Sequence, residues 1–193
     1  WQRLRHLTAA PVTRAAARIQ GPLVLSLGEA PADLRFFFEM LVRLAPDITT
    51  VRALCRACEV RPSTLMSRFS RAGLPSPKSY LASARRWLHE EAPPASVRLL
   101  HAAHLLEAPG RSIADVAYRL EYSSPQSFGR HVRAMLGITS LEFRRRFPFP
   151  AALARFLELM IVPYRGVWPV FHPLETGSWD SGHCLAVQAP PPH

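Results

Sequence analysis

The side chains best suited to chemistry in this sequence are hydrogen-bond donors at helical spacing between Ser124 and Arg133. Gln126, Arg130 and Arg133 recur at intervals of four and three residues, so a helix would present them on one face. An arginine can donate two parallel hydrogen bonds to guanine, and a glutamine can bond adenine in the same bidentate way. The pattern therefore predicts contact with base edges, and the alternative for Arg130 is a phosphate contact.

Two short helices joined by a tight turn would position these donors. Ser112 is suited to cap the first helix, and Pro125 is suited to the first turn of the second helix, which Gly137 ends. The turn comprises residues 121–123. Apolar residues at helical spacing form the inward stripes, namely Ile113, Val116, Ala117 and Leu120, followed by Phe128, Val132, Met135 and Leu136. This arrangement predicts a helix-turn-helix.

The same pattern occurs upstream, between Ile48 and Leu81. Thr49 or Thr50 would cap the first helix, residues 59–61 would form the turn, and Pro62 would begin the second helix. The predicted inward residues are Val51, Leu54, Cys55, Cys58, Leu65 and Phe69. The chain therefore holds two copies of one unit, which we name the first motif (48–81) and the second motif (111–147).

The second motif carries a resemblance to a known family in the segments SIADVAYRL, EYSS, SFGRHVRAMLGIT and EFRRRF. These segments resemble the AraC/XylS family of bacterial transcription regulators, and the resemblance extends over both motifs, from Ile48 to Phe147. It implies an all-helical DNA-binding domain, in which the second helix of each motif lies in successive major-groove segments. It also implies promoter DNA as partner, RNA polymerase as a further candidate partner, and a bacterial cytoplasmic, nucleoid-associated location.

We predict DNA-binding residues in the second helix of each motif and in the residues just before it. In the second motif, Gln126 and Arg130 are the best candidates for reading bases, whereas the first motif offers mainly short or apolar side chains. The complete predicted set is Arg61, Ser63, Thr64, Met66, Ser67 and Arg68 in the first motif and Ser124, Gln126, Ser127, Gly129, Arg130 and Arg133 in the second.

The predicted fold class is all-α, with two three-helix units joined by a linker helix and with short, less structured extensions at both ends. Residues 1–47 could be the remnant of a regulatory domain, with a strand at Pro22–Leu27 and a helix at Asp33–Leu44. Residues 82–110 form the linker, which Pro93 and Pro94 should interrupt because proline disrupts a helix interior. Residues 148–193 should contain one helix, over 150–162, and an irregular tail.

A further departure from the family is the residue that opens each turn. Glu59 and Glu121 stand where the resembled family most often has glycine. The residue after the first helix tends to adopt a positive φ, which costs a non-glycine residue on the order of 1 kcal/mol. Both turns are therefore expected to be strained, and a carboxylate beside the groove would be repelled by phosphate unless it accepts a hydrogen bond from a cytosine amino group.

Composition agrees with a nucleic-acid partner. The formal net charge is +10 and the pI is about 10.9, which favours a polyanion, either nucleic acid or an anionic membrane surface. We expect no membrane segment, because no apolar run approaches the roughly 20 residues of a membrane span. No glycine-rich phosphate loop, nucleophile elbow or carboxylate pair is evident, so the sequence indicates neither an enzyme nor a cofactor.

Three functions remain open at this point. The first is a sequence-specific transcription regulator that reads the major groove mainly through the second motif. The second is a degenerate or truncated relative that binds DNA through charge alone or has become a protein-interaction module. The third is a thiol or metal sensor that uses Cys55 and Cys58, although core packing of both thiols is the default and we assign no metal site. His101 and His104 could share a helical face and bind a metal weakly.

Overall fold

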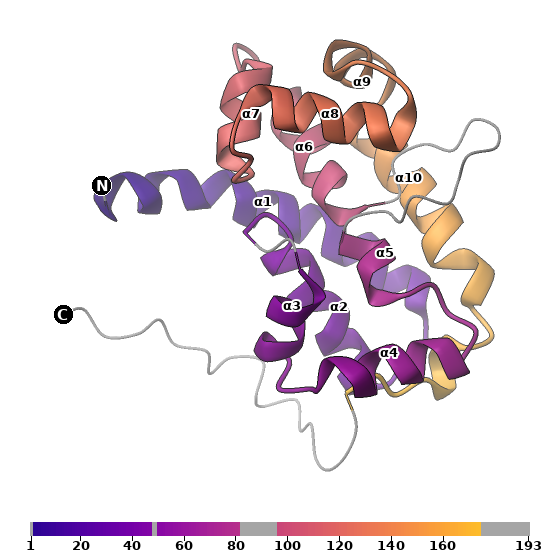
Figure 1. Ribbon diagram of the computed structural model, residues 1–193. Helices are drawn as coiled ribbons and strands as arrows, with labels where there is room; N and C mark the ends of the chain where they lie inside the picture. The colour runs from indigo at the N-terminus through magenta and orange to yellow at the C-terminus, as the bar shows by residue number, and fades with distance from the viewer. Residues whose placement is uncertain (1, 48–49, 82–95, 175–193) are drawn as a thin grey trace.

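A computed structural model describes residues 2–47, 50–81 and 96–174 of the chain (Figure 1). This described part contains α-helices and two short 3₁₀ turns and has no strand, so the predicted all-α fold is confirmed. In chain order the elements are α1 Gln2–Leu27, α2 Ala32–Leu44, α3 Val51–Ala57, α4 Pro62–Arg71, α5 Pro77–Leu81, α6 Val97–Glu107, α7 Ile113–Arg119, α8 Pro125–Leu136, α9 Ser140–Arg146, α10 Phe149–Met160, η1 Val162–Tyr164 and η2 Trp168–Val170.

The strand predicted at Pro22–Leu27 is wrong, because this run forms the last turns of α1. Ile19, Leu23 and Leu27 recur every four residues and are all buried, which is a helical stripe. A short apolar run does not distinguish a strand from a buried helix by itself. Burial of three such side chains contributes about 1.5–3 kcal/mol each, which outweighs the roughly 3 kcal/mol that Pro22 costs in the helix interior.

The helix ends of the two motifs follow the predicted capping residues. Thr50 accepts a hydrogen bond from Ala53 N at 3.2 Å and caps α3. Ser112 caps α7 and forms a reciprocal capping box with Asp115. Ser124 caps α8, with Pro125 in its first turn, and Gly137 ends it with a φ of 69°. These local signals were sufficient to locate the helices that carry the predicted donors.

Aromatic side chains from distant segments form the core of the first motif. Phe38 in α2 packs edge-on against Tyr80 in α5 and against Trp168, with ring centroids 5.5 and 5.7 Å apart. The ring of Phe69 in α4 packs against the rings of Phe37 and Phe171, with centroids 5.4 and 4.9 Å apart. Helix α4 is thus held by aromatic rings from α2 and from the segment after α10. The first motif is therefore stabilised by α2 and by the residues that follow α10.

The segment after α10 is bound to the first motif by polar contacts as well. Asp33 in α2 is buried and accepts from Leu174 N at 3.3 Å, and its other oxygen lies 3.0 Å from His172 Nδ1. Arg68 in α4 donates to the carbonyl oxygen of Pro173 at 2.9 Å. Trp168 is fully buried and donates from Nε1 to Ile161 O. After α10 the described chain therefore forms two short 3₁₀ turns that pack on the first motif, and the rest of the predicted irregular tail lies outside the described residues.

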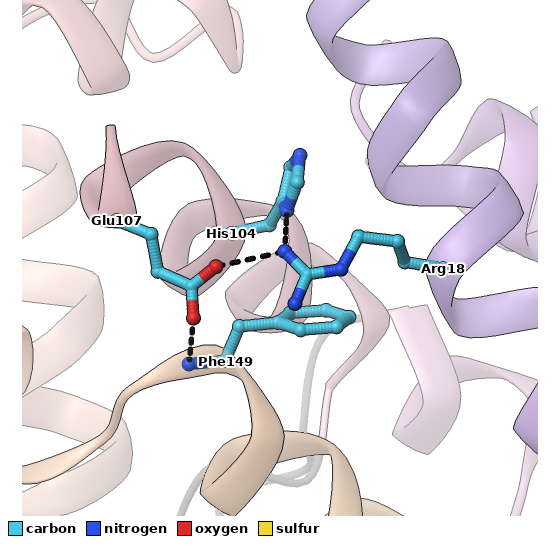
Figure 2. A network of polar contacts seen from close by, with 4 residues as sticks. All are labelled: Arg18, His104, Glu107 and Phe149. Atoms are coloured by element: carbon cyan, nitrogen blue, oxygen red, sulfur yellow. Dashed lines mark hydrogen bonds and ion pairs between the residues drawn. The ribbon is translucent and has the colours of Figure 1, made fainter.

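Helix α1 is fastened to the linker helix α6 and to α10 by a group of four residues shown in Figure 2. The Arg18 guanidinium donates to Glu107 Oε2 and to His104 Nδ1, each at 2.8 Å, and lies 4.2 Å from the centre of the Phe149 ring. Glu107 also accepts from Phe149 N at 3.1 Å. Helices α1, α6 and α10 are thereby joined at one point, which fixes the linker helix against the N-terminal helix.

Of the predicted linker, the structure describes only residues 96–110, which follow the predicted break. Helix α6 begins after Ser96, which accepts from Leu99 N, as the helical run predicted over Ser96–Glu107 requires. Pro93 and Pro94 lie outside the described residues, so the interruption of the linker helix stays a prediction. The helix predicted over 150–162 is confirmed as α10.

Candidate nucleic-acid interface

The two turns that join the helices of each motif have the same backbone geometry. Glu59 N and Val60 N donate to Arg56 O and Cys55 O, and Glu121 N and Tyr122 N donate in the same register to Tyr118 O and Ala117 O. Both sets are the paired hydrogen bonds of a Schellman motif. Glu59 has a φ of 53° and Glu121 a φ of 54°, and they are the only non-glycine residues with positive φ in the described part. The predicted strain at both turns is confirmed.

Helix α8 presents the predicted donors to solvent. Gln126, Arg130 and Arg133 are exposed, whereas Phe128 and Val132 are fully buried on the opposite face. Arg130 Nη2 donates to Ser127 Oγ at 3.1 Å, a contact three residues back along the helix. This contact restrains the guanidinium on the exposed face, which lowers the entropy that a base contact would cost.

Ser124, Ser127 and Gly129 serve the local structure of α8 in addition to any role at the interface. Ser124 Oγ accepts from Ser127 N at 3.1 Å, and the two hydroxyls lie 3.1 Å apart. A Cβ atom at position 129 would lie 3.5 Å from Ser140 Oγ, so Gly129 faces the start of α9. This distance is an ordinary van der Waals contact, so packing against α9 does not by itself require a glycine, and the predicted role of Gly129 at the groove stays a prediction.

Helix α4 presents a less polar surface. Arg61, Ser63, Met66 and Ser67 are exposed, and Thr64 is half-buried. Arg68 is also half-buried, and its donation to Pro173 O directs it toward the C-terminal segment. The outer face of α4 is thus short and partly apolar, as the sequence predicted.

The two helices that carry the predicted DNA contacts lie at opposite ends of the view in Figure 1, with α8 near the top and α4 near the bottom. Binding of both helices to successive groove segments of one duplex stays a prediction.

The second motif carries further arginines outside α8. Arg145 and Arg146 are exposed, whereas Arg144 is half-buried and donates to Arg111 O at 2.9 Å. Hydrogen bonds from Thr139 N and Oγ1 lower the pKa of the Glu142 carboxyl, and the positive charges of Arg146 and Arg133 lower it further. This part of the surface carries net positive charge, which suits contact with phosphates.

Both thiols and His101 are internal, whereas His104 is half-buried. Cys55 and Cys58 are buried free thiols, and burial raises the pKa of Cys58 to about 12. Burial lowers the pKa of His101 to about 4, and its Nε2 lies 2.9 Å from Val42 O, so the ring is neutral and donates to that carbonyl. His104 bonds Arg18. Among the described residues, no group of three or more His, Cys, Asp or Glu side chains could hold a metal ion.

A polar group formed by Arg98, Tyr122 and His131 lies behind α8, and it was not predicted from the sequence. Arg98 lies in α6 with 4 % of its surface exposed, and it donates to Leu120 O, the carbonyl at the end of α7. Tyr122 was assigned to the turn, and His131 was not singled out. The one available signal was an arginine inside the apolar run of residues 97–100, a position where burial is unusual.

Comparison with known families agrees with this geometry. Residues 95–146, which comprise α6 to α9, match a family described as a helix-turn-helix domain, so this part of the chain is a DNA-binding module. The domain is of the AraC type, and the match supports the resemblance to AraC/XylS transcription regulators. It covers roughly a quarter of the chain. Neither the curated proteins nor the solved structures that were compared gave a match.

The matched family consists of DNA-binding regulator domains and is not a family of enzymes. Double-stranded DNA is the partner that such a domain implies. Within the described residues, no single helix is long and apolar enough to cross a bilayer, although the sharply bent pair Ser140–Arg146 and Phe149–Tyr164 meets the length and composition criteria jointly.

Proposed function

We propose that this chain is a sequence-specific transcription regulator that reads promoter DNA mainly through α8. The observation that carries the proposal is the exposed row of Gln126, Arg130 and Arg133 on a helix whose opposite face carries the fully buried Phe128 and Val132. Residues of this kind discriminate between base pairs in the major groove, at about 1–3 kcal/mol for each good bidentate contact.

Helix α4 has a different role in this proposal. Apart from Arg71 in its last turn, its exposed side chains are short or apolar, and Arg68 contacts Pro173 O. We infer that α4 places the protein along the duplex through a second groove contact and contributes less to base discrimination. The remaining predicted residues of both motifs are then contacts to phosphates or shallow groove contacts.

The proposal extends to location and partners. A promoter-binding regulator of the AraC type would act at the nucleoid in the bacterial cytoplasm and could contact RNA polymerase. The alternative that the surface charge supports is binding through phosphates alone, because Arg145 and Arg146 contact DNA equally well at any sequence.

Selection of bound sequences from a random duplex pool near physiological salt distinguishes these functions. We expect an enriched motif, and we expect Arg130→Ala to lower affinity for that motif by about 10- to 100-fold, while affinity for scrambled DNA changes little. The matched control is Arg145→Ala, which removes the same charge from α9 and should weaken both duplexes equally. Recovery of no motif, with binding that vanishes as salt rises, would instead identify a charge-driven DNA-binding protein.

A further inference from the structure

The polar group behind α8 starts at Arg98 in the linker helix α6. Its guanidinium donates to Leu120 O and lies 4.3 Å from the centre of the Tyr122 ring. Leu120 ends α7, and Tyr122 lies in the turn that follows. Within the second motif, Arg98 therefore contacts both the end of α7 and the turn that follows it. These contacts lie on the buried side of the motif, opposite the exposed face of α8.

Tyr122 continues this path into the recognition helix. Its hydroxyl is hydrogen-bonded to His131 Nδ1, and its ring packs edge-on against Phe128, with centroids 5.3 Å apart. Burial raises the pKa of Tyr122 to about 12, so the phenol keeps its proton and donates. Burial, together with the charge of Arg98, lowers the pKa of His131 to about 4, so the neutral imidazole accepts at Nδ1. A continuous line of directional contacts thus joins α6 to α8.

Stability alone is a poor explanation for this group. A buried guanidinium has lost its hydration, and Arg98 Nε has no hydrogen-bond partner among the described residues. Buried charged groups are often replaceable by apolar residues without loss of stability. Apolar contacts, however, tolerate small rotations of a helix, whereas hydrogen bonds weaken steeply when their angle departs from linearity.

We propose that Arg98, Tyr122 and His131 are positioning residues that fix the orientation of α8 relative to α6, so that Gln126 and Arg130 reach base edges together. This inference rests on the proposed function. A rotation of α8 would move both side chains relative to the groove, and it would disturb base contacts more than phosphate contacts, because bidentate pairing depends on position at both ends. The group therefore controls discrimination between sequences.

Tyr122→Phe tests the proposal by removing the hydroxyl and its hydrogen bonds, while the ring, its packing and the stacking of Arg98 on the ring remain. The matched control is Tyr118→Phe, because Tyr118 is 61 % exposed on α7 and lies outside this group. The measured quantity is the ratio of dissociation constants for scrambled and selected duplexes, at a temperature where all variants are folded. We expect Tyr122→Phe to lower this ratio by about tenfold and Tyr118→Phe to leave it unchanged.

Measurements on the free full-length chain separate this inference from the proposed function. Nitrogen NMR of His131 reports its tautomer, and residual dipolar couplings report the angle between α6 and α8. We expect Tyr122→Phe to change both, and Arg98→Met, where it folds, to change the angle further. A changed tautomer with an unchanged helix angle would overturn the positioning role, as would an unchanged discrimination ratio. If the wild-type chain selects no sequence, the proposed function fails, and the helix angle alone decides the positioning role.

Discussion

Replacing Glu121 by glycine should stabilise the protein, which is the opposite of what most substitutions do. Glu121 has a φ of 54° and an exposed side chain, so glycine relieves the strain and loses no buried contact. A non-glycine residue in this region costs on the order of 1 kcal/mol. For a chain of this length, a gain of about 1 kcal/mol raises the melting temperature by about 2–4 °C.

The comparison variant for this experiment is Glu121→Gln. Glutamine removes the charge and keeps both the side-chain length and the strained backbone, so its stability should stay within about 0.5 kcal/mol of the wild type. Thermal unfolding by circular dichroism and urea unfolding measure both variants. If Glu121→Gln stabilises the protein as much as Glu121→Gly does, the carboxylate charge and not the backbone is unfavourable, and the strain argument is refuted.

Glu121→Gly and Glu121→Gln also test whether the carboxylate repels DNA phosphates. If the Glu121 carboxylate lies near phosphate, both substitutions should raise affinity for scrambled DNA, and the gain should shrink as salt is increased. Glu59→Gly provides an independent repeat, because Glu59 has a φ of 53° in a turn with the same hydrogen bonds. In the double variant Glu59→Gly/Glu121→Gly, the two gains in unfolding free energy should add, since the two turns belong to different motifs.

Three further predictions concern stability. Gly129→Ala should raise the melting temperature, because alanine gains about 1 kcal/mol of helix propensity and its Cβ fits 3.5 Å from Ser140 Oγ. A lower melting temperature would show that α8 and α9 pack too closely to admit a methyl group. Phe38→Ala should cost about 3–5 kcal/mol in urea unfolding, and half-buried Phe36→Ala much less; equal losses would contradict the aromatic core. Stability should fall as pH drops from about 6.5 to 4, because burial lowers the pKa of folded His101 to about 4. In this pH range His101 binds fewer protons in the folded chain than in the unfolded chain. Equal urea midpoints at pH 7 and pH 5 would contradict its burial as a neutral ring.

Local features of this fold could be predicted from the sequence because each depends on a few neighbouring residues. The caps at Thr50, Ser112 and Ser124 and the strained glutamates at both turns are determined by backbone chemistry within one helical turn. The inward stripes were predictable for the same reason. Accordingly, the outline of both motifs and the exposed face of α8 were accessible before the structure was known.

Other features depend on contacts between distant residues, and the sequence did not reveal them. Nothing near Trp168 indicates that it packs on Phe38, which lies 130 positions earlier, so this contact between the residues after α10 and the first motif was not predicted. The helical character of residues 22–27 is determined by packing of α1 on α2 and α6 and not by local propensity. Arg98 is inconspicuous in the sequence, because its role depends on a turn more than 20 residues later.

The two motifs share one backbone design and differ in what supports the recognition helix. Helix α4 is supported mainly by apolar contacts, since Phe69 packs between Phe37 and Phe171, and one hydrogen bond from Arg68 to Pro173 O adds to them. Helix α8 is supported from behind by directional polar contacts, through Tyr122 and His131. Apolar packing supplies most of the stability of a fold, whereas directional bonds fix an angle at little net gain in free energy. This difference agrees with a division of labour in which α4 places the protein on the duplex and α8 reads its sequence.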